Sequence, residues 1–343
     1  MRICIIGDVH WSTYSSIVRS RGKYFSTRLE HLIKSMNWVE QVAKEYNCQE
    51  EIFLGDTFDK PDLTSEEISA LSCIKWNDLQ KHFIVGNHES GVSSLVYNST
   101  HALHSIGIVE DIPYLYNLDD KTDILFLPYI TEDDRKPLVE YLKDRDVNKK
   151  LIICSHNDIK DFQMGMFLSK TGFSIDEINA NCDLYLNGHL HNAGFVNDKI
   201  INVGVLCGQN FSEDAFKYEH HIMILDTDTM TYEFIENPNA LNFYKINIDT
   251  EDDINVLYKL KPNAILTIKC LDTLEEMTRK VLATLKDVVE YRVIQYSDTS
   301  FYNKEEAEIV INNIDHLEQF KRFCIEKLGL SGVLSEELNE VCK

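Results

Sequence analysis

Hydrophobic residues in the first half of the chain follow two patterns that alternate. Short continuous apolar runs ending at a glycine or a polar loop indicate buried strands, and apolar positions three and four residues apart indicate helices. By these criteria we expect strands at 2–7, 52–54, 82–85, 122–127, 151–154 and 183–187. We expect helices at 27–46, 64–79 and 134–146. The alternation predicts an α/β fold.

The pattern changes after His191 to closely spaced strand signals. These occupy 193–197, 199–203, 220–226 and 230–236, and they end at Asn237-Pro238-Asn239. A strand–helix–strand–helix–strand order then runs to residue 297 and indicates a second, smaller α+β domain. From 304 onward, apolar residues at three- and four-residue spacing indicate helices. We therefore predict three segments, at 1–237, 238–300 and 301–343.

Four polar blocks stand directly after predicted strands. Each begins with a glycine, which permits a sharp turn and a close approach of the backbone to a crowded site. They read Gly7-Asp8-Val9-His10, Gly55-Asp56-Thr57-Phe58-Asp59, Gly86-Asn87-His88-Glu89 and Gly188-His189-Leu190-His191. A further histidine, His156, stands at the end of the strand 151–154.

The side chains in these blocks are of the types that bind divalent metals. Aspartate, asparagine and histidine together suit borderline ions such as manganese, iron or zinc. Two ions roughly 3.5–4 Å apart need one carboxylate between them and further ligands on either side. One block alone is weak evidence, but all of them in this order predict a two-metal site. The candidate ligands are Asp8, His10, Asp56, Asn87, His156, His189 and His191.

In their order, the blocks resemble those of the calcineurin-like metallophosphoesterase superfamily. The resemblance covers residues 1–236 and implies a four-layer α/β/β/α sandwich with the site at the carboxyl ends of the strands. It also implies that one metal is held by Asp8, His10, Asp56 and His191, and the other by Asp56, Asn87, His156 and His189. Asp56 would then bridge the two metals. His88 would bind no metal and would face the phosphate as a catalytic residue.

Two acidic residues of the blocks are predicted to lie outside the ligand set. Asp59 is interpreted as a residue that supports a ligand or a turn. For Glu89 two interpretations stand side by side: it orients His88, or it is solvated.

Within the superfamily, the chain is similar to the SbcD-type nucleases of DNA repair. The Phe58-Asp59 ending of the second block is typical of them, whereas phosphatases usually carry Asp-Arg there. Ser90 stands where phosphatases carry another arginine, after the third block. A smaller domain followed by helices also matches the order of the capping domain and ATPase-docking segment in these nucleases. The short chain resembles the compact versions found in large tailed phages.

This similarity implies a function and a set of partners. The expected activity is manganese-dependent 3′-to-5′ exonuclease action on duplex ends, with endonuclease action near hairpins, in recombination and repair. The expected partners are a second copy of the chain and an SbcC-type, SMC-like coiled-coil ATPase. The stripe at 304–329 is the candidate dock for that ATPase, and packing against the second domain is the alternative.

Two features depart from what this similarity implies. Gly204-Val205-Leu206 stands where a Gly-Ser/Thr-Pro turn is usual, so the following loop, Gln209 to Lys217, is expected to differ. The net charge of −22 lacks the basic footprint of unaided nucleic-acid binding. One segment, residues 11–29, has no acidic residue and is either a solvated loop or a contact to the DNA backbone. Its candidate contacts are Arg19, Arg21, Lys23 and Arg28.

The remaining composition bears on compartment and on other functions. Nine dispersed cysteines without a Cys-x-x-Cys pair suggest reduced thiols in a cytoplasm, the host cytoplasm for a phage protein. No apolar run approaches the roughly 18–20 residues that span a bilayer, so no membrane partner is expected. Two alternatives stay open. One is a phosphoesterase acting on cyclic nucleotides, small phosphoesters or phosphoproteins, and the other is a non-catalytic scaffold.

Overall fold

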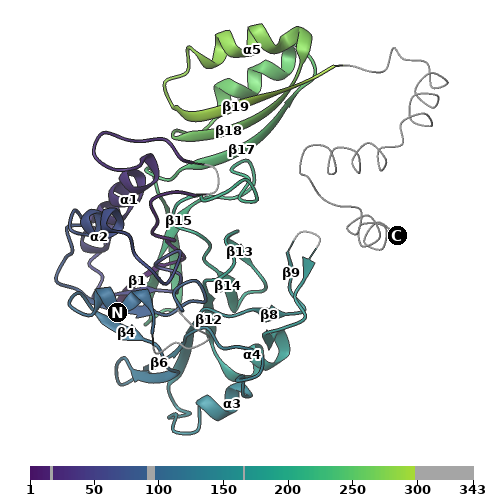
Figure 1. The fold of residues 1–343 in the computed structure, drawn as a ribbon. Helices are drawn as coiled ribbons and strands as arrows, with labels where there is room; N and C mark the ends of the chain where they lie inside the picture. Colours follow the sequence, from purple (N-terminus) through teal and green to yellow (C-terminus); the bar gives the residue numbers. More distant parts are fainter. Residues whose placement is uncertain (16–17, 91–96, 165–166, 298–343) are drawn as a thin grey trace, which may run out of the picture. The chain divides into compact units, whose positions relative to one another are not determined.

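The computed structural model describes residues 1–15, 18–90, 97–164 and 167–297 (Figure 1). Among the described residues, 1–270 and 274–294 form one compact unit. The predicted segment 301–343, with its candidate ATPase dock, lies outside the described residues. The predicted boundary between 237 and 238 stays a prediction.

The first sheet carries the first three polar blocks. Its strand order is β16-β15-β1-β2-β3-β4. Four of these strands run parallel: β1 (Arg2–Ile6), β2 (Glu50–Phe53), β3 (Gln80–Ile84) and β4 (Ile108–Glu110). The strands β15 (His221–Asp226) and β16 (Thr231–Glu236) are added antiparallel on the other side of β1. The carboxyl ends of β1, β2 and β3 therefore open at one edge of the sheet.

The second sheet carries His156 and the last block. Its order is β13-β14-β12-β7-β6-β5, with antiparallel pairs at both edges. The strands are β13 (Gly194–Phe195), β14 (Ile200–Asn202), β12 (Leu184–Asn187), β7 (Lys150–Ser155), β6 (Thr122–Leu127) and β5 (Tyr114–Asn117). Two short pairs lie outside both sheets: β8 (Ile159–Lys160) with β11 (Phe173–Ser174), and β9 (Gln163–Met164) with β10 (Phe167–Leu168).

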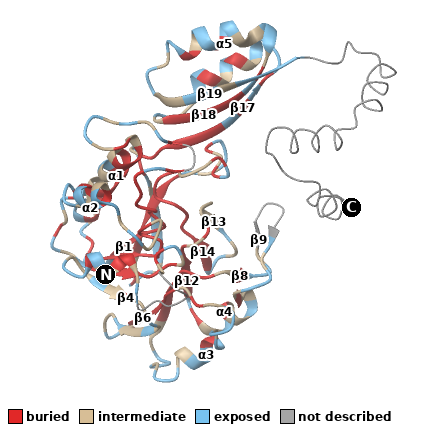
Figure 2. Cartoon of the chain, viewed as in Figure 1, coloured by how far each residue is buried: buried red, intermediate tan, exposed pale blue. Residues whose placement is uncertain are grey.

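Successive side chains along each strand point to opposite faces of the sheet, so each sheet packs against a different layer on each face. Cys4 and Ile6 of β1 face the core shared with the helix α1 (Thr27–Glu45), whereas Ile3 and Ile5 face the core shared with the second sheet. The outer face of the second sheet packs with α3 (Leu138–Tyr141) and α4 (Ile175–Asn181) in a third core. Figure 2 shows the strands buried between helices whose outer faces are exposed. The predicted four-layer α/β/β/α sandwich is confirmed.

Two predicted helices are shorter than expected. The helix α2 (Ser65–Leu71) ends well before residue 79, because the backbone N–H groups of Lys75 and Asn77 bind side chains of α1 in place of helical carbonyls. The helix predicted at 134–146 is the single turn of α3, which begins after Pro137. Proline disfavours helical backbone in the residue before it. The helix η1 (Ser99–Leu103) is a 3₁₀ turn.

The last part of the sandwich unit is a small sheet. Its order is β17-β18-β19, from β17 (Asn242–Ile248), β18 (Ala264–Leu271) and β19 (Val288–Tyr296). The 3₁₀ helices η2 (Asp252–Lys259) and η3 (Asp272–Leu274) and the helix α5 (Glu275–Leu282) connect them, as the sequence predicts. Figure 1 shows α5 lying against one face of this sheet. No helix among the described residues is long and apolar enough to cross a bilayer.

A buried ion network ties α1 to the first sheet. The Lys81 ammonium is fully buried and lies 3.3 Å from Glu40 Oε2 and 3.2 Å from Glu51 Oε2. It also donates to Asn77 Oδ1 at 2.7 Å. Burial and the nearby Glu51 charge raise the pKa of Glu40 to about 7. The single positive charge of Lys81 therefore compensates the negative charges of two carboxylates, Glu40 and Glu51.

Replacing Lys81 by methionine should lower the free energy of unfolding by about 3–5 kcal/mol at pH 7, because both carboxylates lose their counter-charge. Lys81 lowers the pKa of Glu40, which is about 7, so the variant should hold the Glu40 proton to a higher pH, and its loss relative to the wild type should grow as the pH rises past about 7. Urea unfolding at pH 6 and 8 measures both effects. Lys121→Met, which removes an exposed ammonium 3.5 Å from Asp228, should cost under about 1 kcal/mol. Equal losses in the two variants would contradict the account.

Candidate metal centre

All seven predicted ligands meet at one edge of the sandwich. Those from the first sheet follow β1, β2 and β3, and those from the second follow the parallel neighbours β7 and β12. Glycine makes this convergence possible at two points. A Cβ on Gly86 would collide with Asp56 Oδ1, and one on Gly55 would collide with the ring of His156. The residues brought together are Asp8, His10, Asp56, Asn87, His156, His189 and His191.

Three of these ligands sit on strained backbone. The φ angles are 49° at His10, 44° at Asp56 and 71° at His189, in the left-handed region. Such a conformation costs of order 1–3 kcal/mol for a non-glycine residue and persists where its surroundings enforce it. Here the Asp56 carbonyl accepts hydrogen bonds from the N–H groups of Val9 at 3.1 Å and His10 at 2.8 Å. The first two blocks therefore hold each other in place.

The histidines of the first predicted metal site are oriented by carboxylates. His10 Nδ1 lies 3.1 Å from Asp59 Oδ1, and His191 Nδ1 lies 2.6 Å from Glu213 Oε1. Because a carboxylate accepts hydrogen bonds, each Nδ1 carries the ring proton and each Nε2 keeps a lone pair. Within the described part of the chain, His10 Nε2 is buried without a hydrogen-bond partner, 3.8 Å from Asp56 Oδ2.

The histidines of the second predicted site have the same arrangement. His156 Nδ1 donates to the Leu54 carbonyl at 2.8 Å, so in the neutral ring the lone pair is on Nε2, which faces Asn87 Oδ1 at 3.2 Å. His189 Nε2 lies 3.2 Å from Asp158 Oδ1, which leaves His189 Nδ1 facing Asn87 Oδ1 at 3.0 Å. In each case a nitrogen lone pair points at an oxygen acceptor. That contact is repulsive until a cation or a proton lies between the two atoms.

Asp56 lies between the two groups of ligands. Its Oδ2 is 3.1 Å from His156 Nε2 and 3.8 Å from His10 Nε2. The ligand atoms of Asp8, His10 and His191 lie within 4.8 Å of one another, as do those of Asp56, His156 and His189. Asp8 Oδ2 is also buried without a partner. The donor set, its orphaned atoms and its facing lone pairs fit two divalent cations.

The pKa values reflect the same concentration of acceptors. Burial alone would raise the pKa of Asp56, but the charges of His156 and His10 hold it well below its usual range. Burial likewise opposes the charge on His156, yet Asp56 and Asp8 raise its pKa to about 9. The centre therefore favours positive charge, and binding a cation there releases protons.

His88 belongs to this centre and is more accessible than the ligands. Its backbone N–H donates to Asp56 Oδ1 at 3.0 Å, and its Nδ1 donates to the Asp59 carbonyl at 3.0 Å. The side chain is 41% exposed, and its Nε2 is left to hold or release a proton. His88 also has a ligand atom within 4.8 Å of those of His10 and Asp56, so its role as a non-ligand stays a prediction.

Both interpretations of Glu89 drawn from the sequence are wrong. It is fully buried, so it is not solvated, and its two oxygens accept from the backbone N–H groups of Phe58 at 2.9 Å and Gly86 at 2.7 Å. Burial and the Asp56 charge raise its pKa to about 7. Glu89 thus joins the second and third blocks through their backbones, and it does not orient His88.

Two residues that hold ligands were not identified from the sequence. Asp158 orients His189, and Glu213, which is fully buried, orients His191. Asp158 stands two positions after His156 and is visible in the sequence as part of that strand-end segment. Glu213 lies in the loop predicted to differ from related nucleases, where no pattern marks it.

One of the four candidate DNA contacts is wrong. Arg28 is fully buried, and its guanidinium donates to Ser12 Oγ at 3.1 Å and to the carbonyls of His10 at 2.9 Å and Gly208 at 3.0 Å. It therefore braces the first block and offers no surface contact. Arg19, Arg21 and Lys23 are exposed, with Arg21 paired to Glu66 at 2.6 Å, and their contact role stays a prediction.

The fold and the site together define a metal-dependent phosphoester hydrolase. The family model of calcineurin-like phosphoesterases matches residues 1–193, and the chain belongs to that family. Among solved structures, the chain is similar to a dimetal phosphatase from Danio rerio, at 12% identity and a TM-score of 0.39 over 69% of this chain and 99% of that one. No curated protein matches the sequence.

Replacing Glu213 by glutamine should weaken metal binding by roughly 10- to 100-fold, because His191 loses the carboxylate that fixes its tautomer. Calorimetric titration of the metal-free protein with manganese measures the affinity. Glu276→Gln, on the exposed face of α5, is the matched control and should bind as the wild type does. If the Glu213 variant binds manganese with unchanged affinity, Glu213 does not position His191 for metal binding.

Replacing Asp56 by alanine should abolish binding of both metals, because this carboxylate lies between the two ligand groups. Replacing His88 by alanine should leave both metals bound and remove most turnover, because His88 is predicted to act on the phosphate. Mass spectrometry of metal content, with manganese supplied, distinguishes the two variants. Loss of metal from the His88 variant would show that His88 is a ligand.

Proposed function

We propose that the protein is the nuclease subunit of an SbcD-type DNA-processing enzyme, with two manganese ions as cofactors. The substrate would be the phosphodiester backbone at duplex ends and hairpins, cut by 3′-to-5′ exonuclease and endonuclease action. The chain would work as a homodimer with an SbcC-type ATPase in a cytoplasm. When bound, paired divalent cations acidify a water molecule and offset the charge on the phosphate.

The observation that carries the choice of a diester is which residues stand at the end of the second block and after the third. Ser/Thr phosphatases of the superfamily usually carry Asp-Arg at the end of the second block and an arginine after the third, and this chain has Phe58-Asp59, followed by Lys60, and Ser90 there. The Lys60 ammonium forms an ion pair with the buried Glu67, at 3.2 Å. A phosphomonoester is a dianion and needs such a cationic clamp more than a singly charged diester does. The site therefore favours a diester.

Protein groups also suit the diester reaction. The Asp59 carbonyl fixes the proton on His88 Nδ1, so a second proton on this ring would reside on Nε2. An imidazolium there is a competent acid for a leaving alkoxide. Asp59 Oδ1 also accepts a hydrogen bond from Gln209 Nε2 at 2.6 Å. This bond joins the second block to the loop after Cys207.

Three basic side chains on one face of the small sheet, which also carries Glu290, support nucleic acid as the substrate. Alternation places Tyr244 and Ile246 in the core with α5, so Lys245 lies on the opposite face of β17. Lys269 is exposed on the same face of β18, and Arg292 of β19 donates to Thr267 Oγ1 there at 3.1 Å. A local cluster of this kind can bind phosphates despite the net charge of −22.

The purified chain with manganese should degrade end-labelled duplex DNA, and the His88→Ala variant should be slower by roughly 10²- to 10⁴-fold, the usual contribution of a general acid. An SbcC-type ATPase from the same genome should stimulate the wild type. Cyclic nucleotides and 4-nitrophenyl phosphate, assayed in parallel, should be poor substrates. Metal-loaded protein that hydrolyses those compounds and leaves DNA intact would favour the general phosphoesterase alternative.

A further inference from the structure

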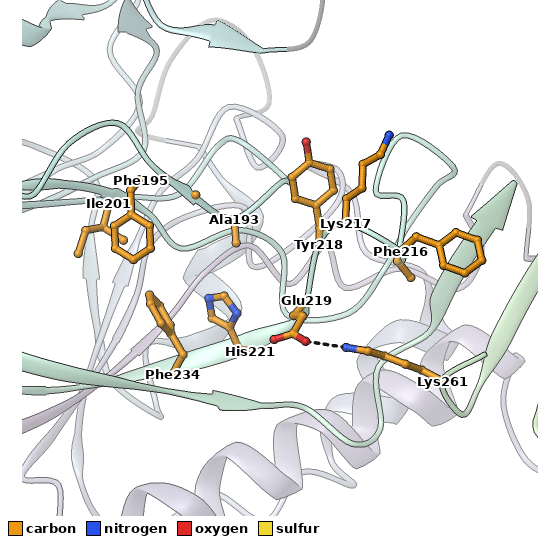
Figure 3. A pocket seen from close by; sticks show the side chains of 12 residues that line it. Ala193, Phe195, Ile201, Phe216, Lys217, Tyr218, Glu219, His221, Phe234 and Lys261 are labelled. Carbon is orange, nitrogen blue, oxygen red and sulfur yellow. Dashed lines mark hydrogen bonds and ion pairs between the residues drawn. The ribbon is translucent and has the colours of Figure 1, made fainter. Parts of the chain in front are cut away.

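A cavity of about 440 Å³ lies among β13, β15, β16 and the loop that follows Glu213 (Figure 3). Two of the residues that line it are close in sequence to residues of the metal centre. Ala193 stands two positions after the predicted ligand His191, and Ala215 stands two positions after Glu213, which holds His191. The volume is that of a small-molecule site. Nothing in the assigned metal chemistry uses this cavity.

Aromatic rings line the cavity and remain accessible. Phe195 of β13 is 57% exposed, and its ring centroid lies 6.1 Å from that of Phe234. Phe216, which is 48% exposed, and Tyr218 belong to the loop on the other side. Figure 3 shows Phe195, Phe234 and His221 gathered together, with Tyr218 across from them. Exposed aromatic side chains around a hollow are typical of a binding site.

One buried polar atom in the lining has no partner. His221 is 8% exposed, its ring centroid lies 4.2 Å from that of Phe234, and its Nε2 has no hydrogen-bond partner among the described residues. Burial and the neighbouring His220 lower the pKa of His221 to about 4, so the ring is neutral at pH 7. An unsatisfied buried nitrogen is costly. A ligand that makes a hydrogen bond there would recover that cost.

The two ammonium groups beside the cavity are already paired with three carboxylates. Lys217 lies 3.4 Å from Asp214, and Lys261 lies 3.0 Å from Glu219 and 2.6 Å from Glu236. An anion would have to break these pairs. The lining therefore suits an uncharged planar ring with hydrogen-bonding edges, which can stack on an aromatic face and reach the free nitrogen of His221.

We propose that this cavity is a nucleobase site, in which one unpaired base stacks on Phe195 and bonds to His221. If the base belongs to the strand being cut, the inference rests on the proposed nuclease function and directs that activity to ends with an unpaired flank. A free nucleotide is the other source of the same ring. Phe195 is the residue to test, because it is exposed and contributes to no ligand of the metal centre.

The test measures stacking without cleavage. The probes are a duplex whose single-stranded 3′ tail carries 2-aminopurine, and free 2-aminopurine nucleotide, both with EDTA present. The wild type and Phe195→Tyr should quench the tail fluorescence. Phe195→Ala should bind the tail roughly 5- to 150-fold more weakly, the usual loss for one stacked base. An abasic site in place of the 2-aminopurine should weaken binding to the wild type by a similar factor, as measured by anisotropy of an end label.

The outcomes separate this proposal from the nuclease function. Quenching of the free nucleotide alone, lost in Phe195→Ala, supports the site with a free nucleotide as its ligand. No quenching of either probe, or equal quenching by Phe195→Ala, overturns the nucleobase site even if manganese-loaded protein cuts DNA. Quenching that depends on Phe195, in a protein that leaves DNA intact, upholds the site and overturns the nuclease function. Thermal unfolding of the variants confirms that each is folded.

Discussion

The repulsion between lone pairs at the strand ends is the constraint on which the centre depends. Four histidines each give one ring nitrogen to an acceptor that fixes a proton there. Three of them, His10, His156 and His189, turn the other nitrogen toward carboxylate or amide oxygens. Left empty, this arrangement is unfavourable, and protonation of His156 relieves it only in part. Two divalent cations would satisfy all of these acceptors at once. The metal centre is therefore also the point at which the two sheets are joined electrostatically.

The surrounding chain is organised to hold these atoms in place. Glycines allow the blocks to approach, and the left-handed backbone at His10, Asp56 and His189 turns the side chains inward. Buried charged groups brace the loops: Arg28 holds the first block, and Glu89 joins the second block to the third. Such bracing stores strain where the geometry of the ligands requires it. Stability of the outer layers comes from separate cores and from the network around Lys81.

Local patterns in the sequence predicted the parts of this structure that depend on neighbouring residues. Apolar runs located the strands, and the blocks after them located the ligands at one edge. Contacts between distant segments were not accessible in the same way. The helix α2 does not continue to residue 79 because side chains of α1 bind the N–H groups of Lys75 and Asn77. Arg28 is buried because its guanidinium donates to carbonyls on two other loops. Glu213 orients His191 from a loop that has no recognisable pattern.

Anomalous diffraction from crystals grown with manganese tests the central claim most directly. We predict two metal peaks, roughly 3.5–4 Å apart, with Asp56 between them. The peak on one side should be bound by Asp8, His10 and His191, and the peak on the other by Asn87, His156 and His189. A single peak, or two peaks that do not share Asp56, would contradict it.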